Sequence, residues 1–324
     1  MHRKRIGVVS GGPSNEYEVS LATGKNVIAA LKKHHADRYS VHDIFIDRAG
    51  NWHKDGAPLS LSDASNQFDV IFNALHGAYG EDGKIQQLLE MHQIPFTGSG
   101  SVGSAVAMNK MLAKKTFTFH GIKTPHSKII SEDDAKNDTN KVVSELFRSW
   151  LLPTVVKPVT SGSSVGVSIA RKYDELAEAL LKAAEHGDVM LEEFISGIEA
   201  TCGVIEGFRG QELYVLPPIE IRPLTGFFDF DAKYAGKSQE IVPASFSHEI
   251  KKAVEELAMK IHRALGLKHY SRSDFIIHPR RGIYALEVNT LPGLTDESLI
   301  PKSLRAVGSD THELIDHLIR LALN

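Results

Sequence analysis

The stretch SRSDFIIHPRRGIYALEVNTLPGLT, residues 271–295, carries the densest pattern in the chain. Two apolar runs, residues 275–278 and 283–288, flank a turn at residues 279–282 that contains Pro and Gly. This arrangement predicts a β-hairpin. Side chains two positions apart on a strand point to the same face, so the hairpin sorts its residues into two faces.

Four polar side chains fall on one face of this predicted hairpin. Arg272 and Asp274 are two apart on the first strand, and Glu287 and Asn289 are two apart on the second. If the strands pair, three oxygen donors converge beside an arginine, and such donors suit Mg²⁺ with phosphates and water as its other ligands. A second interpretation stays open: a solvated ribbon face with a structural Arg–Asp pair.

Working outward, the segments around the hairpin predict a C-terminal unit, residues 195–324. Apolar residues at helical spacing predict helices over residues 247–265 and 312–323, the first of them followed by Gly266. The other strands expected in this unit are 201–205 and 213–215.

The remainder predicts two further units. Over residues 1–109 strands alternate with helices, which indicates a parallel α/β sheet. Residues 110–194 combine helices and short strands in a small α+β unit. The strands expected in these units are 6–9, 41–46, 69–74, 94–96, 128–130, 154–157, 167–170 and 189–194. The expected helices are 19–31, 83–91, 111–119, a polar helix from 131 toward 150, and 174–186.

Composition limits the class of protein. The 324 residues carry 37 Lys and Arg against 40 Asp and Glu, a net charge of −3, which argues against nucleic acid as a partner. The single cysteine, Cys202, excludes an intrachain disulfide, and the 16 histidines show no zinc spacing. No apolar run approaches the ~18 residues that cross a bilayer. We therefore expect a cytoplasmic protein without a membrane partner.

Several other segments are candidates for binding. Lys157 ends an apolar strand, where a buried ammonium is costly unless it meets an anion, and Lys110 opens a helix. The loop 160–166 is rich in Gly and Ser and offers backbone N–H groups to phosphate. Each feature alone is more simply explained as a solvated lysine or a flexible turn.

Two more segments lie where α/β folds place ligand loops, and a third is a candidate lid. Glu16 and His76 each follow a predicted strand and precede a helix. Lys233 and Tyr234 lie in 227–242, a long irregular stretch of the kind that forms lids. Alone, these residues are equally compatible with a helix N-terminal acid, a loop histidine and a surface loop.

Taken together, these segments resemble one family, the D-alanine–D-alanine ligases of the ATP-grasp superfamily. Matching segments follow the family's order through nearly the whole chain. They are GGPSNEYEVS (11–20), LHGAYGEDG (75–83), MNK (108–110), VKP (156–158), GSSVG (162–166), AKY (232–234), RSD (272–274), EVNTLPGLT (287–295) and SLIP (298–301).

The resemblance implies a three-domain ATP-grasp architecture: an N-terminal α/β substrate domain (1–109), a central lid (110–194) and a C-terminal domain with the metal site (195–324). It implies that ATP and two D-alanines give D-alanyl-D-alanine, ADP and phosphate through a D-alanyl phosphate. The dipeptide is a peptidoglycan precursor. The resemblance also implies a homodimer, because members of this family usually form one.

The resemblance also assigns residues to ATP and metal. Lys110 and Lys157 would bind the phosphates. Asp274 and Glu287 would hold one Mg²⁺, and Glu287 with Asn289 a second, with Mn²⁺ as a possible substitute. The remaining nucleotide contacts would come from Ser164, from Glu192 at the adenine amino group, from the backbone of Ile195 and from Glu199 at the ribose.

The two D-alanines are assigned in the same way. Glu16 would bind the first ammonium, with His76 nearby, and Ser298 with the Leu299 N–H would bind the second carboxylate. Arg272 and the Gly293 N–H would stabilise the oxyanion of the tetrahedral intermediate. A triad of Glu16, Ser163 and Tyr234 would close loops over the site, where Lys233 also meets substrate, and exclude water from the acyl phosphate.

Alternatives and departures accompany this resemblance. Asp296 and Glu297 bring extra negative charge next to Ser298, which is expected to weaken carboxylate binding there. The Lys233–Tyr234 pair matches relatives that form a dipeptide rather than a D-lactate ester. The other hypotheses are an ATP-grasp ligase for another amino-acid pair or a D-lactate acceptor, and an inactive nucleotide-binding regulator.

Overall fold

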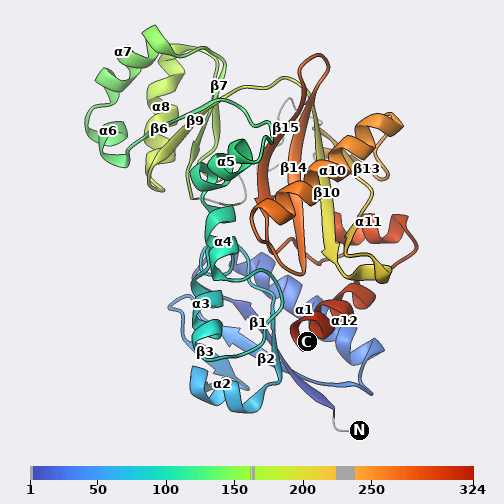
Figure 1. Ribbon diagram of the computed structural model, residues 1–324. Helices are drawn as coiled ribbons and strands as arrows, with labels where there is room; N and C mark the ends of the chain where they lie inside the picture. Colours follow the sequence, from blue (N-terminus) through green and yellow to red (C-terminus); the bar gives the residue numbers. More distant parts are fainter. Residues whose placement is uncertain (1–2, 161, 163–164, 224–237) are drawn as a thin grey trace.

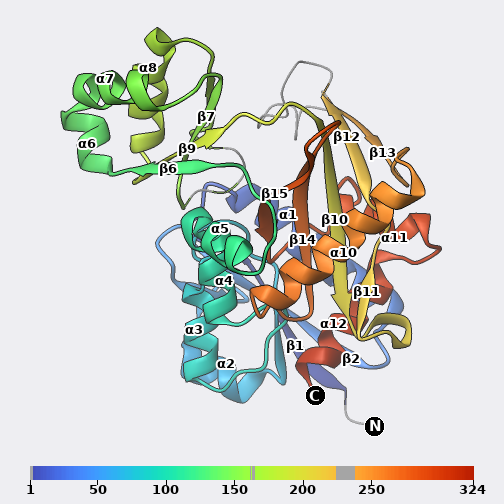
Figure 2. The same ribbon diagram turned by 45° about the horizontal axis from the view of Figure 1, so that its top comes forward.

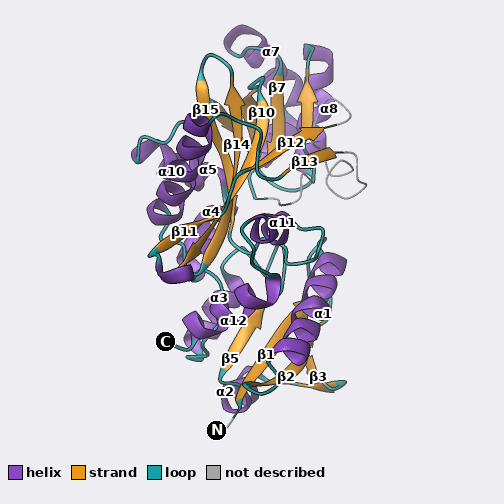
Figure 3. Ribbon diagram, turned by 90° about the vertical axis from the view of Figure 1, so that its right-hand side faces the viewer, coloured by secondary structure: helices purple, strands orange, loops and turns teal. Residues whose placement is uncertain are grey.

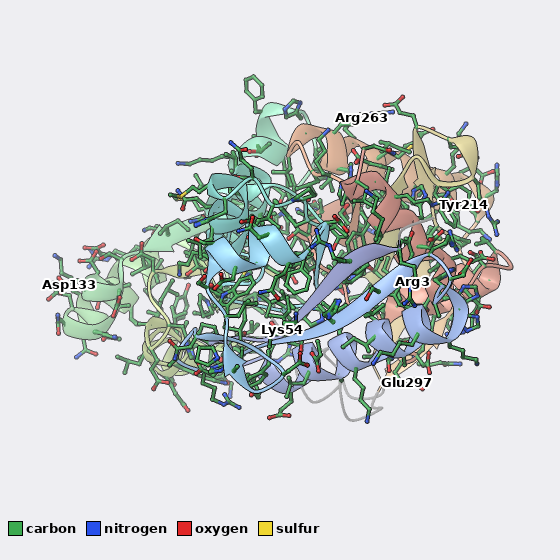
Figure 4. The ribbon with its side chains drawn as sticks, turned by 90° about the horizontal axis from the view of Figure 1, so that it is seen from below. Arg3, Lys54, Asp133, Tyr214, Arg263 and Glu297 are labelled. Carbon is green, nitrogen blue, oxygen red and sulfur yellow. The ribbon has the colours of Figure 1, made fainter. Side chains whose placement is uncertain are left out.

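Three β-sheets organise the computed structural model, which describes residues 3–160, 162, 165–223 and 238–324 (Figure 1). In this view the third sheet lies above the first, and the unit that holds the second projects to one side. Seen from below, Asp133 lies at one end of the molecule and Tyr214 near the other (Figure 4). In the described part of the chain, no helix is long and apolar enough to cross a membrane.

The N-terminal sheet is the predicted parallel α/β sheet, in the order β4-β3-β2-β1-β5. Strand β1 pairs in parallel with β2 on one side and β5 on the other, while β3 and β4 add an antiparallel edge. The bounds are β1 Lys4–Gly11, β2 Tyr39–Ile46, β3 Trp52–Lys54, β4 Ala57–Pro58, β5 Val70–Asn73, α1 Tyr17–His34, α2 Leu61–Gln67, α3 Lys84–Met91 and α4 Ser101–Met108.

Two details of this unit differ from the sequence prediction. The strand expected at 94–96 is only a single bridge, from Phe96 to Ile71. The short edge strands and helices α2 and α4 were not predicted, because their sequences are brief or rich in small residues and lack a clear apolar period.

Gly11 ends β1 with φ +93°, and a Cβ there would lie 2.3 Å from the Ile46 carbonyl oxygen, so this turn requires glycine.

The central sheet is antiparallel, in the order β6-β9-β7-β8. Helix α8 packs on it, and α6 and α7 pack on α8 (Figure 2). The polar helix predicted from 131 toward 150 is two helices, which meet at Asp138 (φ −120°). The bounds are β6 Ser127–Ile130, β7 Thr154–Pro158, β8 Ser168–Ala170, β9 Val189–Glu193, α6 Glu132–Asn137, α7 Thr139–Ser149 and α8 Tyr173–Ala184.

The C-terminal sheet contains the predicted hairpin, in the order β13-β12-β10-β14-β15 with β11 beside β10. Helix α10 covers one face, and the Ser247 hydroxyl caps its start. Gly266 follows the helix at φ +60°, as the sequence predicts. The bounds are β10 Ile198–Glu206, η1 Phe208–Gly210, β11 Leu213–Val215, β12 Ile219–Pro223, β13 Ser238–Ile241, α10 His248–Ala264, β14 Tyr270–His278, β15 Gly282–Asn289, α11 Leu299–Ala306 and α12 Thr311–Ala322.

The hydrophobic cores cross the predicted unit boundaries. One cluster joins Ile6 and Phe72 of the first sheet to Leu304 and Ile315 near the C-terminus. Helix α12 lies beside β5 (Figure 3) and also packs against α1. Helix α5 (Lys110–Phe119), expected in the central unit, packs against α10 and β15, and its Phe117 is fully buried in their core. The division at 109 and 194 stays a prediction.

His269 lies where the first and third sheets meet, and it gives a testable pH dependence. Its Nδ1 accepts a hydrogen bond from the Gly98 N–H at 3.0 Å. Burial lowers the pKa of His269 from 6.5 to about 4. The negative charge of Glu206 raises this pKa and the positive charge of Lys268 lowers it, but burial has the largest effect. Between these pH values the unfolded chain binds more protons, so the stability given by neutral His269 is complete above pH 6.5 and is lost as the pH falls toward 4.

We therefore expect His269→Asn to reduce the loss of unfolding free energy on acidification, by at most about 3 kcal/mol. Asparagine tolerates the φ of +64° at this position and offers an oxygen to the Gly98 N–H. Urea unfolding of both proteins at about pH 7.5 and about pH 4.5 measures the difference. An equal loss of stability in wild type and variant contradicts the assignment.

Candidate active site

A cavity of about 660 Å³ lies where the three sheets meet. Every predicted site residue that the structure describes lines it. They are Glu16, His76, Lys110, Lys157, Glu192, Ile195, Glu199, Arg272, Asp274, Glu287, Asn289, Gly293, Ser298 and Leu299. Four others, Ser163, Ser164, Lys233 and Tyr234, lie outside the described residues.

The hairpin strands pair in the register that brings the predicted polar side chains together. Asp274 is opposite Glu287, and Arg272 is opposite Asn289. The Arg272 guanidinium donates to both carboxylate oxygens of Asp274, with each N···O distance 3.0 Å, and the Thr201 hydroxyl donates to Asp274 Oδ1 at 2.5 Å. The Arg–Asp pair of the alternative interpretation is thus present too, but it lines a cavity.

Arg272 is held in its charged form. Burial alone lowers the pKa of this guanidinium, but Asp274 and Glu287 raise it above its ordinary value. The side chain is 15% exposed. A fixed cation at the wall of a cavity can stabilise an anion that develops beside it.

The oxygen donors on the hairpin fit a hard divalent cation. Asp274 and Glu287 supply carboxylates, and Asn289 Oδ1, which accepts from the Leu291 N–H at 2.9 Å, keeps a second lone pair. The described residues contain no group of three His, Cys, Asp or Glu side chains that could hold a metal ion. An ion bound here therefore needs further ligands from phosphate or water, which is the usual arrangement for Mg²⁺.

Two lysines meet one buried carboxylate on the central side of the cavity. Glu192 on β9 pairs with Lys157 on β7 and with Lys114 on α5, each at 2.5 Å. Burial raises the pKa of Glu192, but the two ammonium groups lower it more, so the carboxyl stays ionised. Burial lowers the pKa of Lys157, but Glu192 and Glu287 raise it above its ordinary value. The sequence analysis missed Lys114, whose helical position gives no sign of its partner.

Lys110 is placed by the start of α5. Its backbone N–H donates to the Val159 carbonyl at 3.0 Å, which holds the helix start beside the end of β7. The Asn109 side chain caps the helix at the Leu112 N–H. The buried ammonium of Lys110 lies 3.8 Å from Glu287 Oε2, so it connects the lysine side of the cavity with the hairpin.

The N-terminal sheet contributes Glu16 and His76 from the loops after β1 and β5. His76 Nε2 lies 2.8 Å from the Thr23 hydroxyl, and its Nδ1 lies 3.7 Å from Glu81 Oε1. Glu81 also accepts from the Gly77 N–H at 3.0 Å and lines the cavity, a contact the sequence did not predict.

Two glycines let the backbone approach the Glu16 carboxylate. A Cβ at Gly77, whose φ is +69°, would lie 2.9 Å from Glu16 Oε1, and a Cβ at Gly162 would lie 2.8 Å from the same oxygen. Gly162, which follows β7 of the central unit, therefore comes close to the N-terminal unit at Glu16. Segments from separate units meet at this carboxylate.

The far end of the cavity is formed by the loop before α11. Gly293 lies so close to Ser298 that a Cβ would sit 2.7 Å from the Ser298 hydroxyl oxygen, which is also 2.8 Å from Thr295 Oγ1. Ser298 is the N-cap residue of α11, so the Leu299 N–H belongs to the helix start, where backbone donors face anions.

The negative charge expected next to Ser298 is partly compensated. The Lys302 ammonium lies 3.1 Å from Glu297 Oε2 and 2.8 Å from Glu240 Oε2. The sequence prediction that Glu297 weakens carboxylate binding did not include this lysine, which stands one helical turn further along α11.

Models of one protein family match both ends of the chain. The model described as "D-ala D-ala ligase N-terminus" matches residues 5–67 and 54–99, and the model described as "D-ala D-ala ligase C-terminus" matches residues 117–320. A D-alanine–D-alanine ligase of Desulforamulus reducens is 40% identical over 322 residues, which cover 98% of this chain and 98% of that protein.

Solved structures of similar proteins have the same fold as this chain. The VanG D-Ala:D-Ser ligase from Enterococcus faecalis is 31% identical with a TM-score of 0.86, covering 99% of this chain and 100% of that one. The D-alanine–D-alanine ligase from Bacillus anthracis complexed with ATP is 32% identical with a TM-score of 0.78, covering 99% and 97%. With its three sheets in the ATP-grasp arrangement, this chain belongs to the D-alanine–D-alanine ligase family, the ATP-dependent ligases of peptidoglycan-precursor synthesis.

Proposed function

We propose that the protein joins two D-alanines into D-alanyl-D-alanine at the cost of ATP, through a D-alanyl phosphate. The observation that carries this proposal is the cavity that gathers Glu16 from the loop after β1, Lys157 from the second sheet and Arg272 from the third. A ligase of this kind must hold a nucleotide and two amino acids at once, and three converging units supply three walls for them.

The nucleotide lies, in this proposal, between the central and C-terminal sheets. Lys110 and Lys157 contact its phosphates, because they are buried cations at the cavity wall. Glu192 and the backbone of Ile195 meet the adenine, and Glu199 on β10 meets the ribose. The part assigned to Ser164 rests on the family resemblance alone.

The metal sites are assigned to the hairpin. Asp274, Glu287 and Asn289 would hold two Mg²⁺ ions, and Mn²⁺ would substitute because it takes similar oxygen ligands. When bound, these ions neutralise phosphate charge during transfer. The support for this assignment is the set of hard oxygen donors on one face of β14 and β15.

Each D-alanine has charged groups that match a wall of the cavity. The first ammonium binds Glu16, with His76 beside it. The second carboxylate binds the Ser298 hydroxyl and the Leu299 N–H at the start of α11, where the helix dipole favours an anion.

The chemistry then follows in two balanced steps. A carboxylate oxygen of the first D-alanine takes the γ-phosphoryl group, and ADP leaves. The amine nitrogen of the second attacks the acyl carbon, a C–N bond forms, the C–O bond to phosphate breaks, and the amine releases a proton. Arg272 and the Gly293 N–H stabilise the oxyanion formed between these events. Ser163, Lys233 and Tyr234 are assigned to closure over the site by resemblance only.

D-Serine is the second candidate for the acceptor. One similar structure is a D-Ala:D-Ser ligase, while the similar curated proteins are D-alanine–D-alanine ligases. Both acceptors carry the same carboxylate and amine, so Ser298 and Leu299 serve either.

By family resemblance we also propose that the protein is a homodimer in the cytoplasm. Light scattering after gel filtration tests the dimer.

The deciding experiment is phosphate release by the purified protein with ATP, Mg²⁺ and D-alanine, followed by mass spectrometry. D-Alanine-dependent phosphate together with the mass of D-alanyl-D-alanine is the expected result. Parallel reactions with D-serine or D-lactate as the second substrate measure acceptor choice. ATP binding without any D-alanine-dependent product would remove the proposed reaction.

A further inference from the structure

Lys114 is a buried lysine to which the proposed reaction gives no task. It lies on α5, its side chain is 5% exposed, and it does not line the cavity. Its ammonium lies 2.5 Å from Glu192 Oε1 and donates to Thr124 Oγ1 and the Pro125 carbonyl, each at 2.8 Å. The ammonium thus has one ion-pair partner and two hydrogen-bond acceptors.

The charge balance around Glu192 is unusual for a buried group. One carboxylate, 3% exposed, meets two ammonium groups, so the cluster of Lys114, Lys157 and Glu192 carries a net positive charge. Only one of the two lysines is needed to compensate the carboxylate. The other, Lys157, lines the cavity, and its pKa stays above the ordinary value although it is buried.

Binding of ATP phosphates at Lys157 would disturb the charge pairing of Glu192, and Lys114 prevents this. If Lys157 turns toward a phosphate, it weakens its contact with Glu192. A buried carboxylate that loses its sole charge partner is strongly destabilised, and that cost would be subtracted from the affinity for ATP. With Lys114 on its other oxygen, Glu192 keeps a charge partner throughout.

We propose that Lys114 is a positioning residue for the nucleotide: it holds Glu192 charge-paired, so that Lys157 is free to exchange its carboxylate partner for a phosphate of ATP. This inference rests on the proposed function, because it takes Lys157 as a phosphate ligand. It predicts an effect on ATP binding that depends on the charge at position 192, not on Lys114 alone.

A double-mutant cycle of Lys114→Met and Glu192→Gln tests this dependence. In Lys114→Met, Glu192 and Lys157 form a neutral pair, and ATP must break it, so we expect ATP affinity to fall by about 10–100-fold. In the double variant no carboxylate competes for Lys157, and we expect at least about tenfold of that loss to return. Glutamine keeps an oxygen for the adenine amino group.

Calorimetric titration with ATP and Mg²⁺ in the absence of D-alanine measures these affinities, and thermal unfolding checks that each variant is folded. Lys114→Arg, which keeps the charge, is the conservative variant and should restore most of the affinity. If Lys114→Met alone does not fold, the comparison of Glu192→Gln with the double variant still decides. Between Glu192→Gln and the double variant, the loss of Lys114 should change ATP affinity less than about threefold.

Two results overturn the inference. Unchanged ATP affinity in Lys114→Met means that Lys157 needs no help. An equal loss whether Glu192 is kept or replaced by glutamine means that Lys114 only supports Thr124 and Pro125. Failure of the proposed function is separate: a wild-type protein that binds ATP but forms no dipeptide contradicts the reaction and leaves this cycle measurable. A wild-type protein that binds no ATP overturns both.

Discussion

Glu287→Gln is expected to lower the turnover number for dipeptide formation by about three orders of magnitude or more. Glu287 is the carboxylate shared between both proposed metal sites, it stands opposite Asp274 in the hairpin, and it lies 3.8 Å from the Lys110 ammonium. A metal ion contributes several kcal/mol to stabilising transferred phosphoryl charge, and each 1.36 kcal/mol is about a factor of ten in rate. The substitution removes one negative charge while keeping the shape of the side chain.

The fold is expected to survive this change, because the Glu287 side chain is 37% exposed and contributes no core packing. Steady-state kinetics over a range of Mg²⁺ concentrations measures the loss, and Mn²⁺ titration followed by electron paramagnetic resonance measures metal binding directly. Glu256→Gln, on the exposed face of α10, is the matched control and should leave both unchanged. Near-normal turnover of Glu287→Gln would contradict the assignment of Glu287 as a metal ligand.

Arg272→Met is expected to lower the turnover number by about 10²–10³, the usual cost of removing one group that stabilises an oxyanion. The guanidinium is partly buried at the cavity wall and fixed by two hydrogen bonds to Asp274. Its charge is therefore in place before substrate arrives. Because the loss concerns the transition state, the turnover number should fall more than the KM for D-alanine rises.

This variant also leaves Asp274 without its main partner, so a lower melting temperature is expected, and the assay must be run below it. Arg272→Lys is the informative comparison, since it keeps the charge but not the two-pronged contact with the carboxylate. It should retain part of both stability and turnover. A folded Arg272→Met protein that turns over within tenfold of wild type contradicts the oxyanion role.

The hairpin illustrates how far local pattern reaches. The period of two along a strand is enough to place Arg272 with Asp274, and Glu287 with Asn289. The turn residues between them predict the pairing. The structure adds the register, in which Asp274 meets Glu287, together with a bulge after Asp274 that the pattern does not encode.

The lysines illustrate where local pattern stops. Lys110 and Lys157 stand out in the sequence because they interrupt apolar context or fall in family motifs. Lys114 has no such mark, since it lies within a helix where a lysine is ordinarily solvated. Its burial results from the packing of α5 between β15 and α10 and from the approach of β9.

The sequence by itself determined the main helices and strands, the parallel first sheet, the face of the hairpin and the family resemblance, because periodicity and short motifs are local properties. The tertiary structure alone decided that Lys114 and Lys157 share Glu192, that Glu81 joins His76, that Lys302 compensates Glu297, and that α5 packs with the third sheet. The reason is physical: a buried charge finds its partner through the packing of elements distant in the chain, and no local period records that packing.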